Sequence, residues 1–330
     1  MANRVKPRLV ESIPGLWRVA AMRSKSVDLL RATKLKWPVY DVWRHFLNRE
    51  SKTLFLRDSM AVRTSWVQKR IIDELKTRGI SMVDVGELLP KENFLELQTL
   101  AEALLGKSSV QRHIKAIQEN IPFPSRSEKP YLISLLGERP TIDSQDGFLD
   151  FSLHEQILGI ISGYLGMYSR LVEVNVLCNV ATPGPATFSQ RWHRDPGDKR
   201  QVKVFLYLRD VDENTGPFCF IPGTHNGGPY RKVFAQTMKV SHYPPEGAVE
   251  RRFKPEQRQV CTGKAGTLIF CDTSGIHRGG DPRSGSRVLL NAVYTTNAGL
   301  ALIGRFFSIS GSPTDFPRCA AQYAVGKLSN

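Results

Sequence analysis

The sequence predicts a mainly β protein with helices (α+β), whose core is an antiparallel sandwich or jelly roll. From about residue 170 onward, segments rich in β-branched and aromatic residues alternate with clusters of Gly, Pro, Asn and Asp. Many short strands separated by such turns are typical of jelly rolls. Before residue 170, apolar residues recur mainly with the spacing of amphipathic helices. These two patterns place a helical region ahead of a β-rich core.

The individual elements follow from the same periodicities. The expected core strands are 171–180, 202–211, 217–223, 266–272 and 287–296, and a further short strand is expected at 80–85. The expected helices are 38–54, 64–78, 91–105 and 153–166. Residues 120–130 contain three prolines, which indicates a linker or a long loop. We therefore expect a helical extension (1–120) packing on the core, a jelly-roll core (121–310) and a C-terminal tail (311–330).

Composition excludes several classes of protein. The 330 residues are 41% hydrophobic and 23% charged, which suits a globular chain with a substantial core. No run of apolar residues is long enough for a membrane-spanning helix. The five cysteines are scattered and form no CxxC pair, so neither a disulfide framework nor a cysteine-based zinc site is expected. A reducing compartment, the cytoplasm, is the expected location.

Positive charge is concentrated at the N-terminus. Residues 1–70 contain 16 of the 46 Lys and Arg residues but only five of the 31 acidic residues, and four of the five tryptophans. Three interpretations remain open: helices that pack on the core with solvated basic residues, peripheral membrane contact through residues 1–70, and recruitment of an acidic substrate or carrier. No nucleic-acid-binding motif is present, so nucleic acid is not an expected partner, and the sequence does not indicate an oligomeric state.

The segment "QRWHRDPGDKRQ" places His193 and Asp195 two residues apart. At the end of a strand, residues i and i+2 point to the same face, so an imidazole and a carboxylate could converge on one point. The same spacing also occurs in polar surface loops. A metal site therefore requires a third ligand elsewhere in the chain.

His277 and Arg287 are candidates for the remainder of such a site. His277 follows an apolar strand through a segment of small residues, and "GGDPRSGS" (279–286) allows the chain to reverse before Arg287. We expect the strand that begins at Arg287 to run back antiparallel, which brings Arg287 near His277. Two histidines and one carboxylate leave positions of a metal open, as in non-haem Fe(II) oxygenases, whereas a structural zinc site is usually closed by a fourth protein ligand.

Four segments in this order and spacing resemble the phytanoyl-CoA dioxygenase (PhyH) family, over roughly residues 130–300. They are "WHRD" (192–195), "VKVFLYLRDVDENTGPFCFIPGTH" (202–225), "GTLIFCDTSGIHRGG" (266–280) and "RVLLNAVYTT" (287–296). The resemblance implies a double-stranded β-helix, cupin-like core and an Fe(II)- and 2-oxoglutarate-dependent dioxygenase. It implies that His193, Asp195 and His277 bind iron, and that Arg287 binds the distal carboxylate of 2-oxoglutarate.

The resemblance also has implications for neighbouring residues. Gly279 stands where some members have a serine that helps to hold 2-oxoglutarate, so this helper must come from elsewhere. Gln190 is a weaker candidate for a polar contact with the co-substrate. His225, which ends the "NTGPFCFIPGTH" segment, is a rival ligand that the family does not use. Because Asp195 is present, where related halogenases have a small residue, hydroxylation or another oxidation is expected and halogenation is not.

The function expected from this resemblance is oxidation of an unactivated C–H bond of a small-molecule or carrier-bound metabolite. The reaction would require Fe(II) as cofactor, consume 2-oxoglutarate and O2, and release succinate and CO2. Ascorbate is a candidate reductant. No catalytic residue beyond the metal centre is expected. Two alternatives from other classes remain: a catalytically silent jelly-roll binding module, and a cupin-like, non-redox metalloenzyme that works without O2.

Overall fold

The computed structural model describes residues 36–59, 64–121, 129–236, 243–299, 305–311, 315–316 and 319–326. Its centre is a six-stranded antiparallel sheet in the order β1-β8-β5-β10-β4-β2. The strands of this large sheet are β1 (Ile80–Asp84), β8 (Thr267–Asp272), β5 (Val202–Tyr207), β10 (Ser286–Thr295), β4 (Arg170–Val180) and β2 (Leu132–Ser134).

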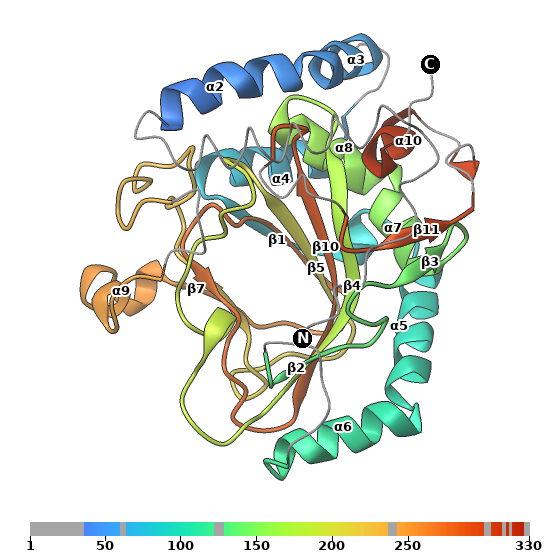
Figure 1. The fold of residues 1–330 in the computed structure, drawn as a ribbon, viewed down its shortest axis with the longest axis vertical. Helices are drawn as coiled ribbons and strands as arrows, with labels where there is room; N and C mark the ends of the chain where they lie inside the picture. The colour runs from blue at the N-terminus through green and yellow to red at the C-terminus, as the bar shows by residue number, and fades with distance from the viewer. Residues whose placement is uncertain are drawn as a thin grey trace, which may run out of the picture.

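A small sheet in the order β7-β6-β9 accompanies the large one, and Figure 1 shows it beside the lower half of the long strands. Its strands are β7 (Gln259–Cys261), β6 (Phe218–Phe220) and β9 (His277–Arg278). A separate pair, β3 (Thr141–Asp143) and β11 (Ser308–Ser310), is parallel. Two antiparallel sheets with helices packed outside confirm the predicted α+β, jelly-roll fold.

Helices cover the outer face of the large sheet (Figure 1). The covering helices are α4 (Trp66–Thr77), α5 (Lys91–Leu105), α6 (Ser108–Gln118), α7 (Gly147–Leu153), α8 (Glu155–Leu165) and α10 (Cys319–Val325). The remaining helices are α2 (Lys36–Leu47), α3 (Arg49–Ser59) and α9 (Ala248–Arg252), with 3-10 turns η1 (Val85–Glu87), η2 (Phe188–Gln190) and η3 (Pro255–Gln257).

Along the central strands, side chains alternate between the hydrophobic core under the helices and the inner face of the large sheet. In β10, Val288, Leu290 and Ala292 are buried against the helices, because successive side chains of a strand point to opposite faces. The intervening residues Arg287 and Leu289 face inward, toward the small sheet. The inner face carries the polar and charged side chains of the cavity beside a second apolar cluster that includes Phe205, Ile269 and Leu289, while the outer face packs into the main hydrophobic core.

The predicted helices and strands are largely confirmed, with informative differences. Ser65 caps α4 with a reciprocal capping box, which explains why the 64–78 pattern begins there. The expected single helix 38–54 is instead two helices, α2 and α3, with Asn48 between them. The Asn48 carboxamide oxygen accepts a hydrogen bond from Ala298 N at 3.1 Å, which ties this junction to the segment after β10. Backbone hydrogen bonds from Asn48 N to Arg44 O and from Lys52 N to Asn48 O continue across the junction. Most of the expected 120–130 linker lies outside the described residues.

The N-terminal region contacts the core at several points. On α2, Asp41 pairs with Lys199, and Arg44 lies 3.4 Å from Asp198. On α3, the Asp58 carboxylate accepts a hydrogen bond from Tyr168 at 2.6 Å. The strand expected at 80–85 is β1, which pairs with β8 as an edge of the large sheet although it lies inside the segment expected to be an extension.

In the part of the chain that the structure describes, no helix combines the length and apolar character needed to cross a membrane.

One hydrogen bond joins the helical layer to the segment that leads toward His277. Tyr164 of α8 donates to a carboxylate oxygen of Asp272 at 2.5 Å, and both side chains are buried. We expect Tyr164→Phe to lower the free energy of unfolding by about 2 kcal/mol, because hydrogen bonds to charged groups are worth about 1.5–3 kcal/mol. Urea unfolding followed by circular dichroism measures this change.

Tyr294→Phe is the matched control. Its hydroxyl is equally buried but donates to a neutral acceptor, Ser152 O, at 2.6 Å. Its loss should cost only about 1 kcal/mol. Equal costs for the two variants would contradict the idea that the Asp272 carboxylate makes the Tyr164 bond the stronger one.

Candidate metal centre

Backbone pairing brings His193 and His277 face to face. His193 N donates to His277 O at 2.8 Å and His277 N donates to His193 O at 2.9 Å, which makes them an antiparallel pair. Directly opposed residues of such a pair project their side chains to the same side. The two imidazole centroids are consequently 4.2 Å apart, although 84 positions of sequence numbering separate the residues.

Asp195 completes a three-residue cluster. Its backbone N donates to Thr273 O at 3.0 Å, so it is held to the same segment that leads to His277. Its carboxylate oxygens lie 3.7 Å from His193 Nε2 and 3.5 Å from His277 Nε2. The three side chains are buried, and one ligand atom of each lies within 4.8 Å of the others. Among the described residues, this is the one group with the geometry of a metal site.

Hydrogen bonds orient both imidazoles for ligation. The Nδ1 atoms of His193 and His277 donate to the carbonyls of Arg191 and Gly275 at 2.8 and 2.9 Å, which leaves each Nε2 lone pair facing the cluster. His277 Nε2 is buried and has no hydrogen-bond partner. Burial lowers the pKa of His193 and lowers that of His277 to about 3, so both rings are neutral at physiological pH. Two neutral nitrogens and a carboxylate suit a divalent transition metal.

A lysine neighbours the acidic member of the cluster. Lys203 of β5 places its ammonium 2.7 Å from an Asp195 oxygen. Burial opposes ionisation of Asp195, but the charge and the hydrogen bond of Lys203 outweigh it and keep the Asp195 pKa well below its usual range. Gln201 Nε2 also donates to Asp195 at 3.2 Å. The carboxylate is therefore ionised and fixed in orientation.

Arg194, between the two ligands, points away from the cluster into the protein. Its guanidinium is fully buried and donates to the backbone carbonyls of Thr224, Ser274 and Val233. Burial lowers the Arg194 pKa to about 10. Three separate segments are thus hydrogen-bonded to the residue between His193 and Asp195. These bonds hold Arg194 on the opposite side of the chain from His193 and Asp195, whose side chains can therefore converge.

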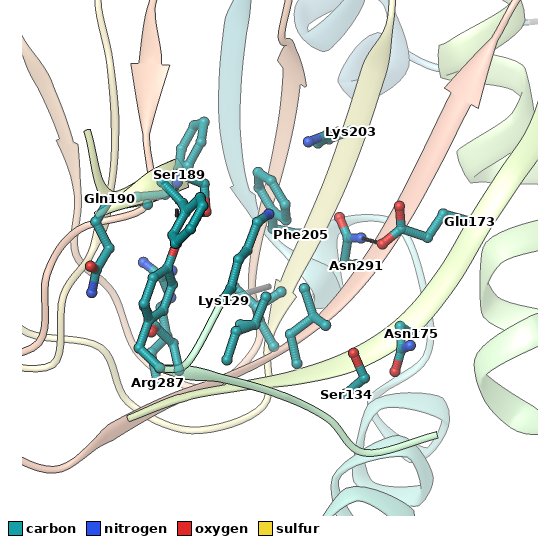
Figure 2. Close-up of a pocket in the computed structure, with 18 of the residues that line it drawn as sticks. Lys129, Ser134, Glu173, Asn175, Ser189, Gln190, Lys203, Phe205, Arg287 and Asn291 are labelled. Atoms are coloured by element: carbon teal, nitrogen blue, oxygen red, sulfur yellow. Dashed lines mark hydrogen bonds between the residues drawn. The ribbon is translucent and has the colours of Figure 1, made fainter. Parts of the chain in front are cut away.

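The cluster opens into a cavity of about 680 Å³ on the inner face of the large sheet. Arg287 lines it and is 6% exposed, with Nη1 donating to Gly216 O and Nε buried without a partner. Figure 2 shows Arg287 on the same side of the cavity as Ser189 and Gln190. A Cβ on Gly279 would lie 3.3 Å from Arg287 Nη2, so the segment after His277 runs directly past the guanidinium.

The expected hairpin between His277 and Arg287 is wrong in its pairing, although the two residues do lie close together. β9, which begins at His277, pairs with β6 of the small sheet, whereas β10, which carries Arg287, pairs with β4 and β5 of the large sheet. The two residues approach each other from facing sheets. The 279–286 segment is therefore a crossing between sheets and not a β-turn within one.

The other two candidates have structural partners. Gln190 is 2% exposed and borders the cavity, but its amide accepts from Thr187 N and donates to Asp281, both at 2.9 Å. The rival ligand His225 lies outside the cluster. Its Nε2 lies 3.1 Å from Lys76 O at the end of α4, and its ring packs against Gly79, where a Cβ would meet Nδ1 at 2.6 Å.

Sequence reasoning missed further polar residues that line the cavity. They are Tyr131, Glu173, Asn175, Asn179, Lys203 and Asn291. The signal was present, because Glu173, Asn175 and Asn179 alternate with apolar residues in "LVEVNVLCNV". Tyr243 also borders the cavity and stacks on His193 with ring centroids 5.5 Å apart.

Curated proteins with similar sequences are dioxygenases. The ectoine dioxygenase of Bordetella bronchiseptica is 29% identical over 98 residues, covering 27% of this chain and 32% of that protein. A probable alpha-ketoglutarate-dependent hypophosphite dioxygenase of Stutzerimonas stutzeri is 24% identical over 173 residues, covering 50% of this chain and 60% of that protein. The chain thus spans between a third and three fifths of the length of these relatives.

A solved structure shares the fold. The epimerase SnoN, crystallised with Fe3+, alpha ketoglutarate and nogalamycin RO, superposes with a TM-score of 0.50 at 16% identity, over 69% of this chain and 83% of that one. Residues 145–288 match the family model of phytanoyl-CoA dioxygenase (PhyH). This segment contains His193, Asp195, His277 and Arg287, and the predicted resemblance to the phytanoyl-CoA dioxygenase family is confirmed over residues 145–288.

Proposed function

We propose that the protein is an Fe(II)- and 2-oxoglutarate-dependent dioxygenase that oxidises a C–H bond of a small molecule. One observation carries the proposal: a buried His193–Asp195–His277 cluster and an underused buried guanidinium, Arg287, share one cavity. A binding module without catalysis would not require both features. The dioxygenase relatives support the same conclusion.

The residues divide into two groups in this proposal. His193, Asp195 and His277 would hold Fe(II) through Nε2, a carboxylate oxygen and Nε2, respectively. Bound iron would supply the site for O2 activation that amino-acid side chains lack. Arg287 would bind the distal carboxylate of 2-oxoglutarate, since its buried Nε and planar guanidinium suit a two-point carboxylate contact. Gln190 borders the same end of the cavity, where its existing hydrogen bonds allow only a weak contact.

The size of the cavity supports a small substrate. A volume of about 680 Å³ lies within the range of cavities, roughly 300–1,000 Å³, that enclose small organic ligands. It has room for 2-oxoglutarate and a second molecule of similar size. The relatives act on ectoine and hypophosphite by name, and both are small. We propose that a carrier-bound substrate would have to present only its reacting end to this cavity.

The first test is anaerobic titration of the protein with Fe(II) and 2-oxoglutarate. We expect the weak visible charge-transfer band of the chelate, and succinate release when O2 is admitted. His277→Gln should weaken Fe(II) binding by more than about 100-fold, because it removes a ligand of the metal itself. His225→Gln is the matched control and should leave Fe(II) binding unchanged per folded molecule.

Two results would contradict the proposal. Absence of the band with both compounds present would favour a binding module without catalysis. Turnover of a substrate without O2, indifferent to Arg287, would favour a non-redox metalloenzyme.

A second prediction concerns the shape of the group at position 287. Arg287→Lys retains the charge but loses the planar two-point contact, so we expect 2-oxoglutarate to bind about tenfold more weakly or worse. Titration of the charge-transfer band against 2-oxoglutarate concentration measures this. Arg283→Lys, on an exposed residue of the same crossing segment, provides the control and should bind 2-oxoglutarate normally. Equal affinity in both variants would exclude Arg287 from the co-substrate site.

A further inference from the structure

A half-buried carboxylate lines the cavity at the end away from Arg287. Glu173 of β4 lies opposite Val293 of β10, and the next register pair on the same face is Asn175 with Asn291. Arg287 and Asn291 are four residues apart on β10, which corresponds to about 13 Å along a strand. Figure 2 shows Glu173 and Asn291 on one side of the cavity and Arg287 on the other. A ligand bound to Glu173 would therefore occupy space that a molecule anchored at Arg287 leaves open.

Among the described residues, no charged side chain forms an ion pair with Glu173. Its carboxylate accepts one hydrogen bond, from Asn291 Nδ2 at 2.8 Å. Burial raises the Glu173 pKa, against the opposing charges of Lys203 and Lys129. Lys203 is bound to Asp195 at 2.7 Å, and no ion pair within 4.0 Å includes Glu173 in the described part of the chain. A half-buried carboxylate that faces a cavity and accepts a single hydrogen bond from a neutral group has lone pairs available to a ligand.

Asn291 supplies a second acceptor beside Glu173. Its Nδ2 donates to the carboxylate, and its Oδ1, which is bonded to the same carbon, is buried without a hydrogen-bond partner. The two side chains together present acceptor oxygens with unused capacity. A protonated nitrogen offers several N–H donors and a positive charge, and it satisfies both oxygens at once. A neutral hydroxyl offers one donor and leaves the charge of Glu173 uncompensated.

We propose that the substrate carries a protonated nitrogen and that this nitrogen binds to Glu173 and Asn291. The inference rests on the proposed dioxygenase function, and it assigns a chemical class to the substrate of that same site. It differs from the acidic substrate considered from the basic N-terminus, because the inner cavity wall at this end presents acceptors.

The charges of the cavity wall suggest the form of the probes. Lys129, Lys203 and Arg287 are matched in number by Glu138, Glu173 and Asp195. Fe(II) and the dianionic co-substrate would also cancel each other. A substrate that brings its own carboxylate with the protonated nitrogen preserves this neutrality, so the probes are the common L-amino acids, each paired with its N-acetyl derivative.

The experiment uses the full chain loaded anaerobically with Fe(II) and 2-oxoglutarate. Binding of each probe is measured by its perturbation of the charge-transfer band, and coupling by succinate release after O2 is admitted. We expect at least one free amino acid to bind, and its N-acetyl derivative to bind about tenfold more weakly or worse, because acetylation removes the charge. Equal binding of both members of each pair, or binding of no free amino acid, would overturn the inference.

Glu173→Gln separates a ligand role from a structural one. We expect this variant to lose the discrimination between free and N-acetylated probes while still forming the charge-transfer band with 2-oxoglutarate. Its melting temperature should stay close to that of the wild type, because the amide oxygen of the variant can still accept the hydrogen bond from Asn291. Glu138→Gln, on an exposed residue of the cavity rim, is the matched control and should keep the discrimination. A lower melting temperature of Glu173→Gln with discrimination retained would assign Glu173 a purely structural role.

The two hypotheses fail in different ways. If no charge-transfer band forms in the wild type, the dioxygenase proposal itself is wrong. If instead the band forms and titrates normally while no free amino acid binds, or while free and N-acetylated probes bind equally, only the assignment of the substrate class is wrong.

Discussion

The reciprocal pair of backbone hydrogen bonds between His193 and His277 is the constraint on which the rest of the site depends. Backbone pairing fixes both the distance and the facing direction of two side chains before any ligand arrives, because directly opposed residues of an antiparallel pair share a face. Asp195 is carried into place by the same constraint through its bond to Thr273. The geometry of the cluster is therefore a property of the main chain.

Buried polar interactions in the surrounding protein keep the His193–His277 pairing in register. Arg194 ties three carbonyls from separate segments to the residue between the ligands, and Tyr164 holds Asp272 at the start of the segment that leads to His277. Each of these groups would be costly to bury without its partners. Their cost is offset by the apolar core on the other face of the large sheet, between the central strands and α4, α7 and α8.

The sequence predicts individual helices and strands better than it predicts contacts between distant segments. Periodicity predicts α4, α5 and β4 because each is specified by its own residues. The hydrogen bond that ties Asn48, between α2 and α3, to Ala298 joins residues 250 positions apart, and no local pattern contains that contact. The placement of Arg287 near His277 was predicted for a wrong reason, since sheet pairing is a non-local property. Lys203 and Glu173 were missed because a charged residue within an apolar strand reads as an outward-facing one, until the topology shows that the inner face lines a cavity.

The division of labour between alternate residues of β4 and β10 has a consequence for protein engineering. Positions such as Val174, Val176 and Leu290 belong to the core, whereas Asn175, Leu177 and Leu289 contact the cavity. A combinatorial library restricted to the second set would change which molecules are accepted while leaving the hydrophobic contacts with the helices intact. Odd-numbered positions of these strands can therefore change substrate specificity, while even-numbered positions maintain the stability of the fold.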